Sequence, residues 1–199
     1  MSNHYLAPRR IHFAHGSSKS RKVISAILDA LDHRVELVTE SGDTLIQRAL
    51  NDHPDLIIAA PRLSDMDGIE AMIRIGETHP IPGIIIASTD DLDQVERAME
   101  DHVMAYLVEP ITVDTLRPAI YLAERRFKHF QSLTDRIESL QTQLEDRKVI
   151  ERAKGLVMKA KGMTESEAHR FLQSLAKQQR KKIAEVATVM CDSEPIDVP

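Results

Sequence analysis

The hydrophobic and polar positions in the first half of the chain follow two alternating periods. Short, β-branched runs at 11–14, 35–38, 55–60, 83–87 and 105–108 predict strands. Between these runs, apolar residues recur at helical spacing. Strands that alternate with helices predict an α/β fold with a five-stranded, doubly wound parallel sheet. In such a sheet, a ligand crevice lies at the carboxyl ends of the strands.

The pattern changes to a single long helix from about 112 to 161, on the order of 45–50 residues and ~70 Å at ~1.5 Å per residue. Within it, large apolar residues recur at steps of three or four residues, as in the seam of a coiled coil. We expect a parallel homodimer; the alternative is a seam covered by the chain's own front domain. The seam residues are Phe130, Leu133, Ile137, Leu140 and Leu144.

Three short helices are expected at the C-terminal end of the chain, around one small core. Gly162 stands where a helix commonly ends in the left-handed conformation. The segment 164–167 reads as a capping box that starts a second helix, and the basic run 180–182 leads to a third. We therefore expect a front domain at 8–115, a coiled-coil helix at 116–143 and a three-helix tip at 144–190.

Charge is unevenly distributed around a formal total of −5. Between Glu145 and Met190 there are eleven Lys or Arg residues and six Asp or Glu residues, a local net of +5. This split favours a polyanionic partner for the C-terminal part, although charge alone fits a solvated surface equally well. Cys191 is the single cysteine, which excludes an internal disulfide. With no apolar run of membrane-spanning length and no apolar leader, a cytoplasmic protein without a membrane partner is expected.

The segments 62–70 and 106–110 resemble the receiver domain of two-component response regulators, and the resemblance covers roughly residues 8–125. It implies the receiver-like, flavodoxin-like sheet with strand order 2-1-3-4-5. A working receiver uses a nucleophilic carboxylate after the third strand, an acidic pair that binds Mg²⁺ after the first, a hydroxyl after the fourth and a lysine after the fifth.

None of these groups is present at the corresponding positions. The carboxylate is replaced by Ala60, the acidic pair by His15 and Gly16, the hydroxyl by Ala87 and the lysine by Glu109. A methyl group cannot carry phosphate and a glutamate would repel it. We therefore predict a degenerate, non-functional phosphorylation site with no catalytic residue, no bound metal and no cofactor. The sequence leaves open whether this site holds any ion.

Other polar residues of the front domain have structural interpretations. Asp65 and Asp67 could be imagined as metal ligands, but a loop followed by a helix start favours turn and N-cap roles. His12 and His15 lie three residues apart around a strand, so they should point to opposite faces and not share a metal.

Residues 135–190 resemble the ANTAR domain, the RNA-binding output module of antiterminator response regulators. The resemblance is carried by Leu144-x-x-Arg147-x-x-Ile150-Glu151-x-Ala153-Lys154-Gly155-Leu156-Val157-Met158, followed by Gly162, Thr164-Glu165-x-Glu167-Ala168, Leu172, Ala176, Ile183 and Val186-Ala187. His169 and Arg180 depart from the usual pattern. The layout as a whole is similar to AmiR-like antiterminators with a degenerate receiver. The resemblance implies binding of tandem RNA hairpins in the leader of a nascent transcript, so that the antiterminator fold forms.

Basic residues of the tip are the expected RNA contacts, because arginine and lysine bind phosphates and loop bases. Gly155, together with Ala153, would let an RNA backbone approach the helix; tight helix packing is the alternative for both. Leu156, Met158 and Met163 are expected in the core. The tip has no aromatic residue on its basic face, so recognition by base stacking is not expected. The expected cationic contacts are Arg147, Lys148, Arg152, Lys154, Lys159, Arg180, Lys181 and Lys182.

The leading hypothesis is thus a dimeric, non-enzymatic antitermination regulator that binds leader RNA. Its input would be a regulatory protein or small effector at the receiver-like domain. The alternative is a protein-interaction adaptor that uses the front domain and the coiled coil. DNA binding is disfavoured because no recognition helix follows a tight glycine turn. The sequence does not identify the target operon, the RNA sequence or the input signal. It also does not show whether dimerisation precedes RNA binding.

Overall fold

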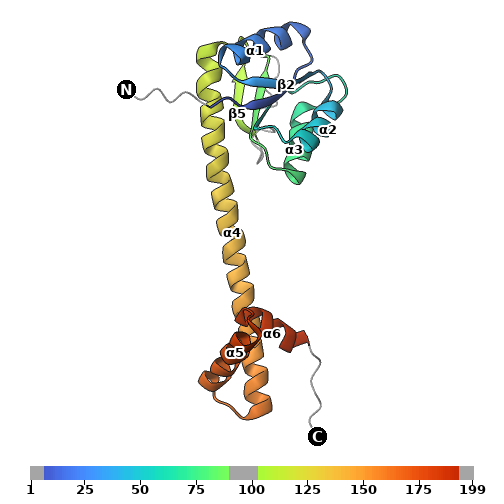
Figure 1. Cartoon of the computed structure of the whole chain (residues 1–199). Helices are drawn as coiled ribbons and strands as arrows, with labels where there is room; N and C mark the ends of the chain where they lie inside the picture. The colour runs from blue at the N-terminus through green and yellow to red at the C-terminus, as the bar shows by residue number, and fades with distance from the viewer. Residues whose placement is uncertain (1–6, 90–102, 193–199) are drawn as a thin grey trace, which may run out of the picture. The chain divides into compact units, whose positions relative to one another are not determined.

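A computed structural model describes residues 7–89 and 103–192 of the chain (Figure 1). The chain divides into two compact units, with the division between Gln131 and Ser132. Each unit has its own apolar core, and they are considered separately below.

The first unit contains a parallel sheet of five strands in the order β2-β1-β3-β4-β5 within the described residues. The predicted order and the doubly wound class are confirmed. β1, β3 and β4 are buried along nearly their whole length, which explains their continuous apolar character. The strands are β1 (Arg10–Ala14), β2 (Arg34–Thr39), β3 (Leu56–Ala59), β4 (Gly83–Ala87) and β5 (Val103–Val108).

Helices cover both faces of this sheet (Figure 1). α1 (Ser18–Ala30) and the start of α4 (Val113–Lys161) pack on one face, where Phe13 and Leu116 belong to the same core cluster. α2 (Gly42–Asp52) and α3 (Gly68–Thr78) pack on the other. On α1, Ile24 and Leu28 are buried against the sheet, whereas Val23 is 47 % exposed.

α4 is a continuous helix of 49 residues, close to the expected bounds. It passes without a break through the boundaries expected at 115/116 and 143/144, so those domain limits stay predictions. The helix ends at Lys161, and Gly162 follows with a φ of 63°, the left-handed conformation predicted for it.

The tip consists of the end of α4 with α5 (Glu165–Gln179) and α6 (Ile183–Asp192). α5 begins with the predicted capping box, in which Thr164 and Glu167 exchange hydrogen bonds. The small core gathers alanines and branched residues from all three helices, which is why these short helices need one another. Its fully buried members are Ala153, Val157, Ala168, Leu172 and Ala187.

Candidate nucleic-acid interface

The positions that the receiver resemblance assigns to a phosphorylation site lie together at the carboxyl ends of adjacent strands. Ala60 follows β3 and donates its N–H to the carbonyl of Ala14, at 2.9 Å. Glu109 follows β5 and donates its N–H to the carbonyl of Ala87, at 2.8 Å. The structure therefore brings together the residues that the sequence placed in this site, none of which is an aspartate, a hydroxyl or a lysine.

His15 and Glu109 face each other in this site. The Nε2 atom of His15 lies 3.6 Å from Oε1 of Glu109, and the imidazole is mostly buried. The N–H of Ser17 donates to Nδ1 of His15 at 3.0 Å, which leaves Nε2 as the protonated nitrogen of the neutral ring. A carboxylate thus occupies the place where a receiver has the cation that holds its phosphoryl group.

The two aspartates of the loop before α3 stabilise helix starts. Asp67 is the N-cap of α3 and accepts hydrogen bonds from the N–H groups of Ile69 and Glu70. Asp65 accepts from the hydroxyl of Ser41 and the N–H of Gly42, both at 2.7 Å, and these bonds lower the pKa of its carboxyl. The turn and capping interpretation is confirmed, and Asp65 accepts hydrogen bonds at the start of α2.

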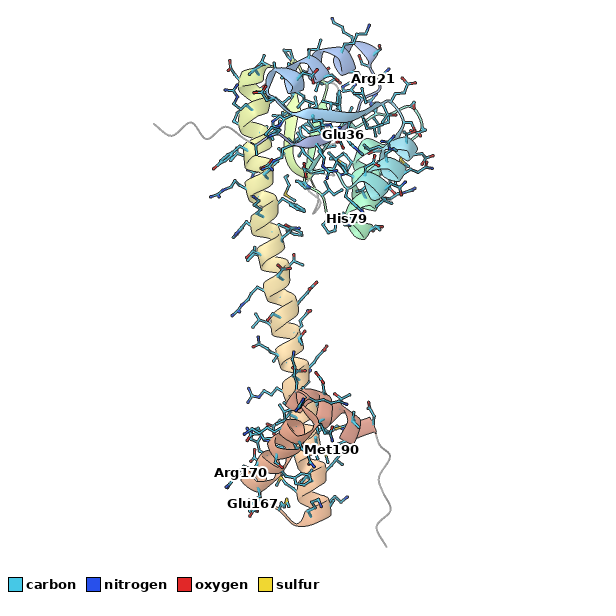
Figure 2. All side chains as sticks on the ribbon, viewed as in Figure 1. Arg21, Glu36, His79, Glu167, Arg170 and Met190 are labelled. Carbon is cyan, nitrogen blue, oxygen red and sulfur yellow. The ribbon has the colours of Figure 1, made fainter. Side chains whose placement is uncertain are left out.

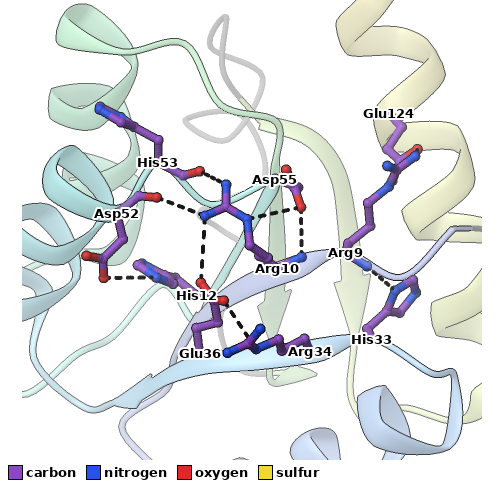
Figure 3. Close-up of polar contacts among 10 residues, drawn as sticks. All are labelled: Arg9, Arg10, His12, His33, Arg34, Glu36, Asp52, His53, Asp55 and Glu124. Carbon is purple, nitrogen blue, oxygen red and sulfur yellow. Dashed lines mark hydrogen bonds and ion pairs between the residues drawn. The ribbon is translucent and has the colours of Figure 1, made fainter.

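At the opposite edge of the sheet, arginines are bound by internal acceptors (Figure 3). Arg10 donates to the carbonyls of Asp52 and His53, which end α2, and pairs with Asp55 and Glu36. A guanidinium at the C-terminal carbonyls also matches the negative end of the helix dipole. These charges therefore hold the front domain together.

Two histidines in the same region are buried and neutral. His12 is fully buried with Nε2 3.6 Å from Asp52, and its ring nitrogens make no hydrogen bond to the described residues. His33 is 4 % exposed and accepts from the N–H of Arg9. Burial lowers the pKa of both imidazoles. The side chain of Arg9 binds Glu124 of α4 through two bonds of 2.6 and 2.9 Å (Figure 3).

In the tip, one face of α4 is basic and exposed. Lys148, Arg152, Gly155 and Lys159 recur at steps of four, three and four residues, which places them on one side of the helix. All four are exposed, and within the described residues none of the three cations has an ion-pair partner. The tip core lies behind them, because Ala153 and Val157 of the same helix are buried.

The other expected cations are also exposed. Arg147 lies on α4, and Lys181 and Lys182 precede α6. Arg180 ends α5 in the left-handed conformation, with a φ of 54°. No ion pair holds any of these four side chains within the part of the chain that the structure describes. By contrast, Arg170 on α5 bonds Ser166 of the preceding turn, and Glu167 is engaged in the capping box (Figure 2).

Lys154 differs from the other cations and requires a correction. It is 7 % exposed, and its ammonium bonds Glu151 at 2.9 Å and Glu165 at 2.7 Å. These hydrogen bonds raise the pKa of Lys154. A buried ammonium that is held by two carboxylates is not presented to a polyanion, so the structure does not support Lys154 as an RNA contact.

The two small residues beside Lys154, Ala153 and Gly155, also differ in their burial. Ala153 is fully buried, so helix packing explains it. A Cβ at Gly155 would meet no heavy atom within 4 Å, so packing within the tip does not explain this glycine. Met158 and Met163 pack on the tip core as expected, whereas Leu156 is 44 % exposed, and its expected core position is wrong.

The apolar seam is exposed over most of its length. Leu133, Ile137, Leu140 and Leu144 are 51, 56, 44 and 59 % exposed, whereas Phe130 is half-buried. A stripe of large apolar side chains on a helix surface is the feature expected of an unpaired coiled-coil strand.

Two family models match the chain. The response regulator receiver domain matches residues 14–121, and the ANTAR domain matches residues 138–190. The transcriptional regulatory protein PdtaR of Mycobacterium tuberculosis is 34 % identical over 188 residues, covering 94 % of this chain and 91 % of that protein. The chain belongs to the ANTAR-domain response regulators. PdtaR is named as a transcriptional regulatory protein.

Other similarities of this ANTAR response regulator cover only part of the chain. The DNA-binding transcriptional regulator NtrC of Escherichia coli is 30 % identical over 93 residues, 46 % of this chain and 19 % of that protein. The signal receiver domain of a modulated diguanylate cyclase from Desulfovibrio desulfuricans has a TM-score of 0.57 at 23 % identity, covering 61 % of this chain and 98 % of that one. NtrX from Brucella abortus has a TM-score of 0.58 at 17 % identity, over 65 % of this chain and 29 % of that one. These structures support the fold.

Two properties bear on other kinds of site in the regulator. Among the helices described, none combines the length and the apolar character that a membrane crossing requires. No cluster of three or more His, Cys, Asp or Glu side chains within residues 7–89 and 103–192 is arranged to hold a metal ion.

The inward position of Lys154 could have been read from the sequence. It lies four residues after Ile150 and three before Val157, and both of these pack on the tip core. Helical periodicity therefore places Lys154 on the buried side. Its partner Glu165 had no such signal, because the turn at Gly162 must first bring α5 back towards α4.

Proposed function

We propose that this ANTAR response regulator is an RNA-binding antitermination regulator that acts as a homodimer. The dimer binds tandem hairpins in a nascent leader transcript through its tips and favours the antiterminator fold. The observation that carries the proposal is the exposed basic face of α4, in which Lys148, Arg152 and Lys159 surround Gly155 and have no ion-pair partner among the residues that the structure describes.

This face suits RNA for physical reasons. Unpaired cations at helical spacing release counterions from a phosphate backbone on binding. Gly155 adds no side chain to the surface, so a backbone or loop can come within contact distance of the helix. Arg180, Lys181 and Lys182 add a second basic segment, next to the N–H groups that begin α6. Phosphate contacts and loop shape supply recognition without base-stacking aromatics.

The homodimer forms along the seam from Phe130 to Leu144. Four of its five large apolar residues are about half exposed in the single chain, and a parallel second copy would bury them at the a and d positions. Two copies of the tip match an RNA that carries two hairpins.

The receiver-like domain receives its input without phosphorylation. Ala60 offers no nucleophile, and Glu109 places a negative charge beside His15 where a phosphoryl group would have to be bound. A regulatory protein or a small effector that contacts this domain is the proposed input. A Phos-tag gel after incubation with acetyl phosphate and Mg²⁺ tests this point: no shifted band is expected, and a shifted band would contradict it.

A gel-shift titration with a two-hairpin leader RNA tests the RNA-binding function. The expected result is a saturable complex whose affinity falls as salt rises, with a slope that reports the number of phosphate contacts. A duplex DNA of equal length and charge is the control for non-specific polyanion binding. Equal affinity for RNA and DNA, or no complex at 50 mM salt, would contradict the proposal.

A further inference from the structure

Lys154 joins the two helices that enclose the tip core. Its ammonium lies between Glu151, one turn earlier on α4, and Glu165, the first residue of α5. The lysine side chain is 8 % exposed, whereas the two glutamates are 55 and 69 % exposed. A buried cation is thus held between two carboxylates that face the solvent.

We infer that Lys154 is a positioning residue of the RNA surface, which acts through Glu151 and Glu165 and does not touch RNA. The inference rests on the proposed RNA-binding function. Lys154 has two effects on the surface: it fixes the first turn of α5 against α4, and it neutralises two carboxylates that border the basic face.

The first effect is mechanical. α4 and α5 are joined by a short turn in which Gly162 has the left-handed backbone that commonly ends a helix. The hydrogen bonds of the capping box join Thr164 and Glu167 to each other and start α5. The bond from Lys154 to Glu165, over eleven residues of sequence, ties this first turn to α4. Together with the packing of Ala168 and Leu172 in the tip core, this tie places α5, and with it Arg180 at the far end of the helix.

The second effect is electrostatic. Glu151 lies three residues after Lys148 and four before Gly155, so it borders the outward face of α4. Hydrogen bonding from Lys154 lowers the pKa of Glu165, so this carboxylate stays ionised. Without the lysine, two exposed negative charges would be left uncompensated beside the proposed phosphate path, and they would repel RNA.

A set of variants in which charged side chains are replaced by uncharged ones distinguishes a positioning lysine from an RNA contact. Lys154→Met should weaken binding of the two-hairpin RNA about tenfold while the salt slope stays within about 0.3 of the wild-type value. Adding Glu151→Gln and Glu165→Gln should restore the affinity to within about twofold. Arg152→Met is the matched control: it should lower the slope by about 0.7–0.9, and the same two glutamine substitutions should not restore that slope.

The opposite pattern would overturn the inference. If Lys154 bound phosphate, its loss would lower the slope as Arg152→Met does, and neutralising the glutamates would not recover it. Should Lys154→Met alone unfold the tip in far-UV circular dichroism, the variant with all three groups neutral decides, since it retains no unpaired buried charge. If the salt dependence of RNA binding in that variant has the wild-type slope, the inference is supported. A slope lower by about 0.7–0.9, as expected for the loss of one phosphate contact, overturns it.

An RNA-free measurement separates this inference from the proposed function. Thermal unfolding of the full chain with Lys154→Met, Glu165→Gln and both changes should show non-additive shifts, because the two groups are bonded. Additive shifts would overturn the inference even if the wild-type chain binds RNA. If the wild-type chain does not bind the RNA while the shifts are non-additive, the proposed RNA-binding function is contradicted. The bond between Lys154 and Glu165 is then still supported.

Discussion

The two units of this regulator treat their charged and apolar groups in opposite ways. In the first unit, six arginines are ion-paired: Arg9, Arg10, Arg21, Arg34, Arg48 and Arg74. In the second unit, seven of the eight expected RNA-binding cations are exposed without an ion pair, and the apolar seam is about half exposed. Charges that are already paired hold a fold, and charges that are not can bind a partner.

The same contrast separates the two sites that the sequence suggested. The positions that correspond to a receiver's phosphorylation site carry none of the groups that the reaction needs, and His15 and Glu109 face each other there. The tip has kept an exposed basic face around an open glycine. A regulator can lose one input chemistry while its output surface stays intact, because the two surfaces depend on different residues.

The largest expected effect is on association of two chains. Ile137→Glu with Leu140→Glu should raise the dimer dissociation constant by at least about 1000-fold, because each copy would bury two charges in the seam. The fold of each chain should be retained, since both side chains are about half exposed. Sedimentation equilibrium measures the change. Ser139→Glu with Thr142→Glu, off the seam, is the control; an equal loss of dimer in that variant would contradict the seam.

The packing of the front domain should tolerate no added side chain where α3 begins against β3. A Cβ at Gly68 would lie 1.9 Å from the carbonyl oxygen of Ala60, a backbone atom that cannot move aside. Gly68→Ala should therefore lower the free energy of unfolding by about 3 kcal/mol or more. Urea unfolding checks this value, and a loss below about 1 kcal/mol would show that the junction of β3 and α3 is looser than described.

Neutralising the basic face should weaken RNA binding without changing stability. The variant Lys148→Gln, Arg152→Gln, Lys159→Gln should lose on the order of 100-fold in affinity at 0.15 M salt, with a slope lower by about two to three units. Its control carries the same change in charge on the front domain: Lys19→Gln, Lys22→Gln and Arg125→Gln. If the two variants lose equal affinity, net charge and not this face determines binding.

Acid should destabilise the front domain through its buried histidines. Burial lowers the folded-state pKa of His12 and His33, so below about pH 6.5 the unfolded chain binds protons that the folded chain does not. Their contribution to stability is complete above that pH and is lost as the pH falls towards the folded values, by at most about 1.4 kcal/mol per pH unit for each. Unfolding at pH 7.5 and 5.5 tests it, and His33→Gln should reduce the slope. An unchanged slope in that variant would contradict the assignment.

The smallest expected effect separates stability from binding at one position. Gly155→Ala should stabilise the tip by about 0.5–1 kcal/mol, because alanine favours a helix and meets no neighbour here. The same methyl group should weaken RNA binding severalfold if RNA comes close. Gly162→Ala, at a φ of 63°, should instead destabilise the tip by about 1 kcal/mol. If Gly155→Ala leaves the RNA affinity unchanged, the RNA does not bind close to this glycine.

Local patterns foretold most of the fold. The strand order followed from the receiver resemblance, the length of α4 from the absence of helix breakers, and the start of α5 from its capping box. The seam and the basic face follow from spacing within one helix. Apart from the strand order, these features depend on neighbours within a few residues, which a sequence displays directly.

Features that join distant segments could not be read in the same way. His15 and Glu109 meet because β1 and β5 end at the same edge of the sheet, although 94 residues separate them. The bond from Lys154 to Glu165 depends on how the chain turns at Gly162. Lys154 was predicted as an RNA contact from its charge and motif; Glu151 is a neighbour on the same helix, but only packing of α5 against α4 gives Lys154 its second carboxylate partner, Glu165.

The most direct test of the central claim is the mass of the full chain in solution by multi-angle light scattering, with and without a two-hairpin RNA. The account predicts a complex of two chains and one RNA at 50 mM salt, which dissociates as salt is raised. A chain that elutes as a monomer and leaves the RNA in its own peak, at every salt concentration, would contradict it.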